Sequence, residues 1–498
     1  MATSTDTPKL RRRLTTQDAS FLYAESVSGP VHIGMLSIFD GRIPFNQLVR
    51  HIQERLHLLP RYRQRLVFAP FNLAHATLED DPEFRLENHV KRHSFPEGTS
   101  EAEMIEAATR AFEPPLDRTH PLWEVHAFEG IEGSRTGLLC KIHHCLVDGV
   151  SWIELTKVLF DFDAESPAPP PSGEPWTPAP LPSPSETFRS AAEDLAQAQA
   201  EAKRLAQELS QNPEKLAQRT RQLEETARSL SEMFARPIVS TPWNGAPTTQ
   251  RRSLVWSCYP FDGIRAIRNA LGGTVNDVVL AMLSEGAARY LSQHGCRTDG
   301  LPLRIGCPVS VRREDELGTL GNRVSMMFPE LPATPMGPVE RLAAVTKETQ
   351  LIKSGRAAEL LALLMESWDI VPPSQSALYS LYTSARLDSA AMWGAFTPMP
   401  PPSQRPTTST FGINFVATNI PGVQAPQHLA GHRCRDNIFL LPIGGGAGYG
   451  VAILSYNQKL YFGMIAEPRL MPDVNLMKSL VDKVFEQLKD AAAKVTGG

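Results

Sequence analysis

Apolar positions along the chain follow two alternating patterns, which predict strands and helices in turn. Between residues 14 and 163, the runs VHIGMLSIFD and GLLCKI have the continuous apolar character of buried strands. The runs FNQLVRHIQERLHLL, EAEMIEAATRAF and SWIELTKVLFDF carry apolar residues at helical spacing instead. In the third run, one face is expected to carry Trp152, Leu155, Leu159 and Phe162. This part of the chain is therefore predicted to be an α/β unit.

A second α/β unit is predicted to begin near Arg252. The run TVNDVVLAMLSEGAARYLSQHG is typical of a helix whose first turn carries Asn276 and Asp277, and a final amphipathic helix is expected from about Asp473 to Val495. Between them, LRIGCPVSVR, FGINFVATNIPG and GVAILSYNQKLYFGMIAE are typical of strands. Because 498 residues exceed the usual size of one hydrophobic core, two units are the expected arrangement.

A proline-rich stretch from Ser166 to Pro184 separates the two units and favours an extended linker. After it, apolar residues recur every seven positions, at Phe188, Leu195, Ala202, Leu209, Leu216, Leu223 and Leu230. Asn212 can cap a helix and Pro213 fits its first turn, so a helical hairpin broken at this point is predicted. This hairpin could be a scaffold packed across both units, a mobile lid or a membrane-contacting element.

We therefore expect three regions. Residues 1–165 form the first unit, residues 166–251 form the linker and helical insert, and residues 252–498 form the second unit.

Charge and cysteine content narrow the possible functions. The 50 basic and 54 acidic residues give a net charge of −4, which leaves no broad cationic surface for nucleic acid. The six cysteines are scattered without a Cys-x-x-Cys pair, which favours reduced thiols over disulfides or a zinc site. No apolar run reaches the roughly 18 residues of a spanning helix. We expect a cytoplasmic protein that is soluble or lies on a membrane surface.

The stretch KIHHCLVDGVS, Lys141 to Ser151, holds the candidate chemistry. Neighbouring side chains at a strand end point to opposite faces, so only one of His143 and His144 need face a cleft and act as a base. Asp148 can either orient that imidazole or pair with an arginine. Gly149 is expected to keep the approach to the base clear and to permit the turn into the next helix. Because adjacent strand histidines diverge and no further ligand pair lies nearby, no metal site is expected.

This stretch matches the HHxxxDG signature of the CoA-dependent acyltransferase superfamily, and the chain resembles the bacterial wax ester synthase/diacylglycerol acyltransferase family. Further matches occur in the family's order: LTTQDASFLYAE near the start, LEDDPEFRLENHV (78–90), PLWEVHAFEGIEG (121–133), NDVVLA (276–281), PVSVR (308–312), Gly321 with Asn322, and NIPG (419–422). They cover nearly the whole chain except the linker and helical insert.

The resemblance implies an α/β fold of two chloramphenicol-acetyltransferase-like domains. Each is a mixed β-sheet flanked by helices, and the active-site channel lies at their interface. His144 corresponds to the family's general base, and His143 would support it. Asp148 is expected to bond to an arginine, for which Arg312 is the candidate, and Gly149 completes the signature.

Two further motifs carry roles that the resemblance implies. Pro121, Leu122 and Trp123 correspond to a motif linked to the substrate channel, although plain core packing of Trp123 is the alternative. Asn276 and Asp277 correspond to a motif linked to activity. Asn276 lies in a first helical turn, where it could help hold the thioester oxygen, and the alternative is that the pair only caps the helix.

The activity implied is transfer of a fatty acyl group from acyl-CoA, as co-substrate, to diacylglycerol or a long-chain alcohol, with no cofactor. The products would be triacylglycerol or wax ester. Peripheral association with membrane or lipid inclusions is expected, with contact regions at Ala357–Val371 and Ala377–Phe396 unless these are buried interdomain helices. The rival functions are a condensation-type acyltransferase and a lipid-binding member of the fold without turnover.

Overall fold

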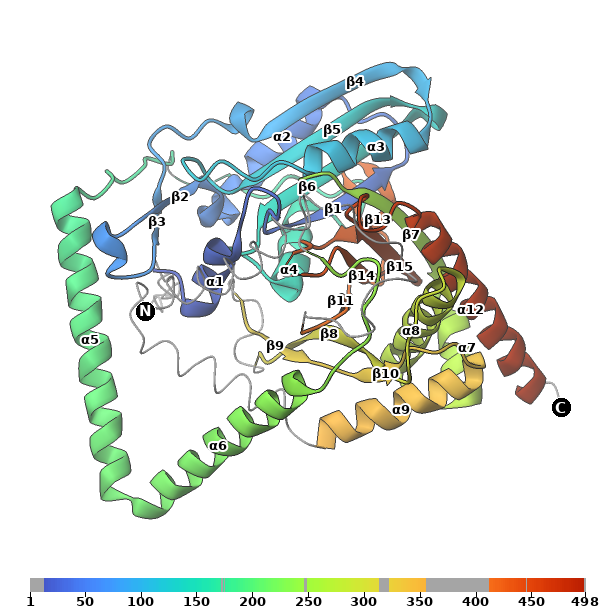
Figure 1. Cartoon of the computed structure of the whole chain (residues 1–498). Coiled ribbons are helices and arrows are strands. Elements are labelled where there is room, and N and C mark those ends of the chain that lie inside the picture. Colours follow the sequence, from blue (N-terminus) through green and yellow to red (C-terminus); the bar gives the residue numbers. More distant parts are fainter. Residues whose placement is uncertain are drawn as a thin grey trace, which may run out of the picture.

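The computed structural model describes residues 13–171, 173, 175–245, 249–312, 322–354, 412–444 and 446–496. Two mixed β-sheets, with helices packed around them, make up most of these residues (Figure 1). The predicted fold class is therefore confirmed. Three predicted features lie outside the described residues: Gly321 and the two lipid-contact regions, Ala357–Val371 and Ala377–Phe396.

The first sheet has six strands in the order β12-β13-β1-β6-β5-β4. Strand β1 is buried along its whole length and pairs antiparallel with both β6 and β13, whereas β4 and β5 are parallel. The strands are β1 (His32–Phe39), β4 (Val90–Thr99), β5 (Trp123–Ile131), β6 (Arg135–His143), β12 (His428–Leu429) and β13 (His432–Leu440). Helices α1 (Thr16–Ala24), α2 (Phe45–Arg55), α3 (Glu101–Phe112) and α4 (Gly149–Leu159) belong to this unit.

The second sheet follows the order β10-β8-β11-β14-β15-β7, with β9 paired to β8. Its strands are β7 (Ser253–Pro260), β8 (Pro302–Ser310), β9 (Val324–Met327), β10 (Glu330–Pro332), β11 (Phe415–Ile420), β14 (Tyr449–Tyr456) and β15 (Lys459–Ala466). Helices α7 (Phe261–Leu271), α8 (Val275–Gln293), α9 (Pro338–Ser354) and α12 (Val474–Thr496) pack on one another beside the sheet (Figure 1). The strands and helices predicted after Arg252 are present wherever the structure describes the residues concerned.

Strands β12 and β13 come from the second half of the sequence but complete the first sheet. A buried hydrogen bond fixes this exchange, because Ser37 Oγ on β1 donates to Asn437 Oδ1 on β13 at 2.8 Å. The sequence patterns did not predict the exchange. The boundaries at residues 165 and 251 remain predictions, and the first sheet draws on residues from both sides of them.

Helix α4 is shorter than predicted. It ends at Leu159, and Phe160 has the extended backbone of a helix cap, with φ −113° and ψ 139°. The ring of Phe160 is buried edge-on against Phe39, with 5.6 Å between ring centroids, whereas Phe162 is 54% exposed. The prediction that Phe162 shares the buried face of the helix is therefore wrong, because packing on Phe39 ends the helix first.

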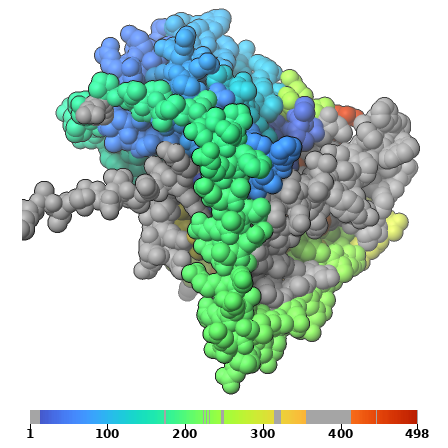
Figure 2. All heavy atoms as spheres, turned by 90° about the vertical axis from the view of Figure 1, so that its left-hand side faces the viewer, coloured from blue at the N-terminus to red at the C-terminus, as the bar shows by residue number. Residues whose placement is uncertain are grey.

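The insert forms two helices, α5 (Pro184–Gln211) and α6 (Pro213–Ala235), which we call the helical arm. The predicted break is confirmed, since the Asn212 side chain accepts from the Lys215 N–H at 3.0 Å. The two helices diverge from this corner, and α5 runs along the face shown in Figure 2 (Figures 1 and 2). Near its start α5 packs Ala191 on the first unit, and near its end α6 receives a hydrogen bond from Arg304 of β8. The arm thus contacts both units.

Candidate active site

Neighbouring strands hold the backbone of the histidine pair at the end of β6. The His143 N–H donates to the carbonyl of Leu122 at 3.0 Å, just before β5 begins. The His144 N–H donates to the carbonyl of Val31 at 3.0 Å, just before β1 begins. The turn that carries the two rings is therefore fixed on both sides.

His143 is fully buried, and its ring is committed to structural contacts. Its Nδ1 accepts from the Cys145 N–H at 3.1 Å, so Nε2 carries the proton of the neutral ring. That nitrogen lies 3.4 Å from Glu25 Oε1. Burial lowers the pKa of His143, which favours the neutral ring at pH 7. Burial alone would raise the pKa of Glu25, but its contacts with His143, Val31 and Arg118 lower it to about 2.

His144 has different surroundings. Its ring is partly exposed and stacks on Phe21 of α1, with 4.0 Å between centroids and 10° between planes. Its Nδ1 lies 3.1 Å from Asn322 Oδ1, and no hydrogen bond to Nε2 is found within the described residues. Desolvation by the surrounding protein lowers the pKa of His144. At neutral pH the imidazole is therefore free to accept a proton.

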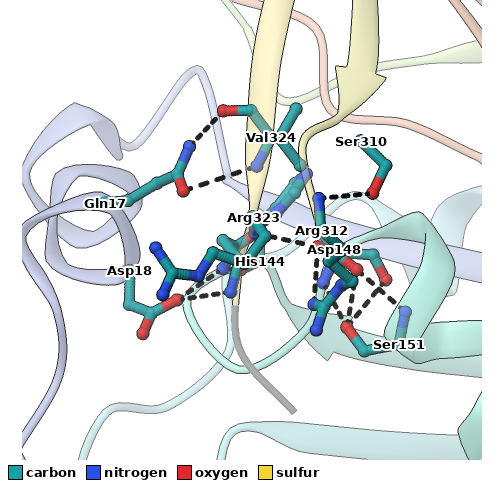
Figure 3. Close-up of polar contacts among 10 residues, drawn as sticks. Gln17, Asp18, His144, Asp148, Ser151, Ser310, Arg312, Arg323 and Val324 are labelled. Atoms are coloured by element: carbon teal, nitrogen blue, oxygen red, sulfur yellow. Dashed lines mark hydrogen bonds and ion pairs between the residues drawn. The ribbon is translucent and has the colours of Figure 1, made fainter. Parts of the chain in front are cut away.

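Asp148 joins the start of α4 to the second unit (Figure 3). Its Oδ1 accepts from the Ser151 N–H at 2.8 Å, which caps the helix. Its Oδ2 accepts from Arg312 Nη2 at 2.8 Å and from the Arg323 N–H at 3.0 Å. Burial would raise the pKa of Asp148, but the hydrogen bonds from Ser151 and the charge of Arg312 lower it.

The arginine pairing is thus the role that the contacts of Asp148 favour. Arg312, the candidate partner, forms this ion pair with Asp148. The side chains of Arg312 and Asp148 are both almost completely buried. Both carboxylate oxygens are occupied by other donors than the imidazole, so the geometry does not support direct orientation of His144 by Asp148.

Gly149 serves a purpose that the sequence did not indicate. A β-carbon at this position would lie 2.8 Å from Cδ1 of Ile420, at the end of β11. The space beside the glycine is therefore filled by the second unit and is not an open approach to the base. Glycine lets the start of α4 and the end of β11 meet closely.

Pro121, Leu122 and Trp123 lie at the start of β5, next to the end of β6 that carries the histidine pair. Trp123 is 2% exposed, its Nε1 donates to the Tyr62 carbonyl at 2.8 Å, and its ring stacks on His89. Pro121 and Trp123 also line a cavity of about 480 Å³. Their buried contacts agree with core packing, and the role in a substrate channel stays a prediction.

Asn276 and Asp277 lie in the first turn of α8. Asp277 is buried, and its Oδ2 accepts from the Thr274 N–H at 2.8 Å in a capping box. Its Oδ1 accepts from Thr349 of α9 at 2.7 Å. Asn276 Oδ1 accepts from Asn419 Nδ2 at 3.2 Å. Asp277 therefore has a structural position, and the proposed contact of Asn276 with substrate stays a prediction.

Four residues at the site lay within the matched motifs but were given no role from the sequence: Asp18, Phe21, Glu25 and Asn322. The first three lie in LTTQDASFLYAE at positions i, i+3 and i+7, which places them on one face of a helix. This spacing was a usable signal. Asn322 lay in the matched Gly321–Asn322 pair, but its partner could not be predicted because Asp18 lies 304 positions away in the sequence.

Two further properties concern metal and membrane. Among the residues that the structure describes, no three His, Cys, Asp or Glu side chains are grouped so that they could hold a metal ion. In the same ranges, every helix is too short or too polar to cross a bilayer.

Comparison with known families identifies both halves of the chain. The model of the wax ester synthase/diacylglycerol acyltransferase catalytic domain matches residues 14–279, and that of the family's C-terminal domain matches residues 320–489. A probable diacylglycerol O-acyltransferase of Mycobacterium tuberculosis is 30% identical over 480 residues, which cover 95% of this chain and 94% of the relative. A putative diacylglycerol O-acyltransferase of the same species is 27% identical over 469 residues, covering 93% and 87%.

Solved structures share the fold. The wax ester synthase/diacylglycerol acyltransferase from Marinobacter aquaeolei VT8 superposes with a TM-score of 0.65 at 20% identity, covering 97% of this chain and all of that one. The starter condensation domain of rhizomide synthetase, in complex with C8-CoA and Leu-SNAC, gives a TM-score of 0.57 at 14% identity, covering 97% and 94%. With both family models matched in order over its two units, this chain belongs to the wax ester synthase/diacylglycerol acyltransferase family and is an acyl-CoA-dependent O-acyltransferase.

Proposed function

We propose that His144 is the general base in the transfer of a fatty acyl group from acyl-CoA to the hydroxyl of diacylglycerol or a long-chain alcohol. The observation that carries this proposal is the different use of the two histidine rings. His143 is buried and its Nδ1 lone pair accepts from a backbone N–H, whereas His144 is partly exposed and its contact to Asn322 uses Nδ1. The Nε2 lone pair of His144 is thus the one available for proton transfer.

The reaction then proceeds without a covalent acyl-enzyme. Nε2 of His144 takes the proton of the acceptor hydroxyl as its oxygen attacks the thioester carbonyl, and a tetrahedral intermediate forms. When the intermediate collapses, the carbon–sulfur bond breaks and the imidazolium returns the proton to the CoA thiolate. The nearby Cys145 is fully buried and burial raises the pKa of its thiol well above the usual value, so it is a poor nucleophile.

Neighbouring groups support this chemistry in our proposal. His143 and Glu25 hold the strand end, and the stacked ring of Phe21 restricts rotation of the His144 imidazole. Asn276 is proposed to donate to the thioester oxygen as it becomes negatively charged, since its own carbonyl oxygen already accepts from Asn419.

Thiol release from palmitoyl-CoA, with dioleoylglycerol or hexadecanol as acceptor, tests the assignment. His144→Ala should lower kcat by about 10²- to 10⁴-fold while the fold is retained, because a general base of this kind contributes about that factor. His143→Ala is the matched control and should lower kcat less. Equal residual rates for the two variants would refute the assignment. A wild-type protein that releases no CoA above background with either acceptor would instead be a lipid-binding member of the fold.

We also propose that the enzyme works at a lipid surface, where both apolar substrates reside, and that the loop Pro70–Asn72 contacts it. Phe71 is 85% exposed and has a left-handed backbone, φ 57°, which costs a non-glycine residue about 1–2 kcal/mol. Phe68, two residues before Pro70, is 44% exposed. Strained, exposed aromatic residues of this kind are typical of contact sites at the interface between lipid and water.

Flotation with phosphatidylcholine vesicles that contain dioleoylglycerol tests this contact. Phe71→Ser should reduce the bound fraction several-fold, whereas Phe162→Ser, which removes a ring elsewhere that is 54% exposed, should not. Equal flotation of wild type and Phe71→Ser would exclude this loop as the contact.

A further inference from the structure

We infer that Asn322 is the positioning residue that keeps the proton of the neutral His144 ring on Nδ1, and that helix α1 holds Asn322 in this role through Asp18. The inference rests on the proposed role of His144 as base. It adds a residue that does not touch the reacting atoms but decides which ring nitrogen carries the lone pair.

The hydrogen bonds of the Asn322 side chain determine its orientation. Its Nδ2 donates to Asp18 Oδ1 at 2.8 Å and to the His144 carbonyl oxygen at 2.7 Å. Both partners can only accept, so the amide nitrogen must face them and the amide oxygen must face the ring. An amide oxygen can only accept, and the His144 Nδ1 at 3.1 Å must therefore donate. The lone pair of the neutral ring is left on Nε2.

Helix α1 supplies a single face that contacts this whole arrangement. Asp18, Phe21 and Glu25 lie at i, i+3 and i+7 on that face, the last of them as the C-cap residue of the helix. Asp18 accepts from both the backbone N–H and the side chain of Asn322, at 2.9 and 2.8 Å. Phe21 stacks on the ring of His144, and Glu25 lies against Nε2 of His143. One short helix therefore contacts both histidines and the amide that orients the second.

Asp18 has two uses in this arrangement. It closes the capping box at the start of α1, where its Oδ2 accepts from the Thr15 N–H at 3.4 Å, while Oδ1 holds Asn322. Gln17, the preceding residue, is hydrogen-bonded to both the N–H and the carbonyl of Val324 on β9, which strengthens the same junction (Figure 3). The position of Asn322 is therefore set by residues of the first unit.

Because Asn322 belongs to the second unit and His144 to the first, the ring is oriented only when the two units are docked. A carboxylate of the first unit could have oriented the ring without this docking, and Asp148 is the nearest one in the sequence. Its oxygens, however, already accept from Ser151, Arg312 and Arg323. Loss of Asn322 removes the side-chain acceptor of Nδ1–H and the amide that holds the His144 carbonyl, which itself interacts with the ring. The imidazole is then less firmly oriented, and we expect kcat to fall by about 10²-fold.

Two variants of Asn322 distinguish positioning from a merely structural role. Asn322→Leu should lower kcat by about 10²-fold and change KM by less than about threefold, because substrate is not contacted. Asn322→Asp, combined with Asp18→Asn so that residue 18 can donate to the new carboxylate, keeps an acceptor for Nδ1–H but adds a negative charge beside the ring, which stabilises the imidazolium. As the pH is lowered, its kcat/KM should therefore begin to fall at a higher pH than that of the wild type.

Asn437→Leu is the matched control, because it removes another buried amide that bridges the two halves of the chain. Asn437 on β13 accepts from Ser37 on β1, away from the ring. This substitution should lower the melting temperature without moving the pH profile. An unmoved acid limb in the double variant of Asn322→Asp with Asp18→Asn, or a loss of kcat in Asn322→Leu no larger than in Asn437→Leu, would overturn the inference.

Histidine-selective ¹⁵N NMR of the wild-type protein gives a test that needs no folded Asn322 variant. The resonance pair lost in His144→Gln should show a protonated Nδ1 and an unprotonated Nε2 at neutral pH, and a mixture of tautomers would contradict the inference. The outcomes also separate it from the proposed function. If His144→Ala keeps its activity, the base assignment fails; if that variant is inactive but the Asn322 variants behave as controls, only the role of Asn322 fails.

Discussion

At the scale of single residues, the adjacent histidines differ because Nδ1 accepts a hydrogen bond in one ring and donates one in the other. The Nδ1 lone pair of His143 accepts from the Cys145 N–H, whereas Nδ1 of His144 faces Asn322 Oδ1. Identity and position in the sequence do not distinguish the two rings. Their hydrogen-bond partners do, and these partners come from different parts of the chain.

The pH dependence of the wild-type enzyme follows from the burial of His144. Desolvation lowers the pKa of this imidazole from its usual value near 6.5, and a base must be unprotonated to work. Activity should therefore be lost as the pH falls through that lowered pKa, and kcat/KM should have its acid limb below about pH 6.5. Measuring kcat/KM in the thiol-release assay from about pH 5 to about pH 8 checks this. An acid limb centred above pH 6.5 would mean that the imidazolium is stabilised.

Replacement of Asp148 should affect stability before it affects chemistry. In Asp148→Ala, the start of α4 loses its cap and the buried guanidinium of Arg312 loses its carboxylate, which together cost about 3–5 kcal/mol or more. Asp148→Asn retains a good capping side chain and loses only the charge, so it should be the milder variant. Urea unfolding of both variants measures the difference.

A stable but inactive Asp148→Ala protein would contradict this account. It would mean that the carboxylate acts on the base more directly than its hydrogen bonds indicate.

At the scale of elements, local sequence signals predicted starts better than ends. Helix α3 begins and ends where the sequence indicated, because Ser100 provides a capping box and prolines follow at 114 and 115. Helix α4 lacks such a stop signal, and its end is set by packing of Phe160 on Phe39 of β1. Contacts of this kind depend on tertiary structure and cannot be read from spacing.

The junction between α4 and β11 can be tested by a pair of substitutions. Gly149→Ala places a methyl group 2.8 Å from Ile420 Cδ1, and overpacking of this kind typically costs about 1–3 kcal/mol. Ile420→Ala removes the opposing atoms and should restore part of the stability and activity lost in Gly149→Ala. Melting temperatures and kcat of the two single variants and the double variant form the cycle. Additive losses would show that the two positions do not interact.

At the scale of the whole molecule, the two sheets cannot be separated by cutting the chain once. Strand β1 pairs with β6 on one side and with β13 on the other, and β13 lies 400 positions after β1 at the Ser37–Asn437 hydrogen bond. The patterns of apolar residues predicted two α/β units, and the KIHHCLVDGVS motif predicted the histidine site. They could not predict this exchange, or the contact between Asp18 and Asn322, because nothing in the local sequence marks a partner so far away.

A chain divided at the predicted boundary tests this dependence. Residues 1–251 expressed alone should be largely insoluble, because β1 would expose an edge of unpaired backbone groups that β13 otherwise covers. Co-expression with residues 252–498 should recover soluble protein and some thiol release. A soluble, cooperatively unfolding fragment 1–251 would show that β12 and β13 are dispensable for the first sheet.

The late arrival of β13 has a consequence for protein synthesis. The ribosome makes this chain from its N-terminus. Strand β1, in the sheet that carries the proposed base, therefore has no second neighbour until residues 432–440 have been made. Nearly nine-tenths of the polypeptide therefore has to leave the exit tunnel before that sheet can close. A prematurely terminated product would carry the HHxxxDG signature but lack β13. The unpaired edge of β1 would then be exposed to quality-control proteases.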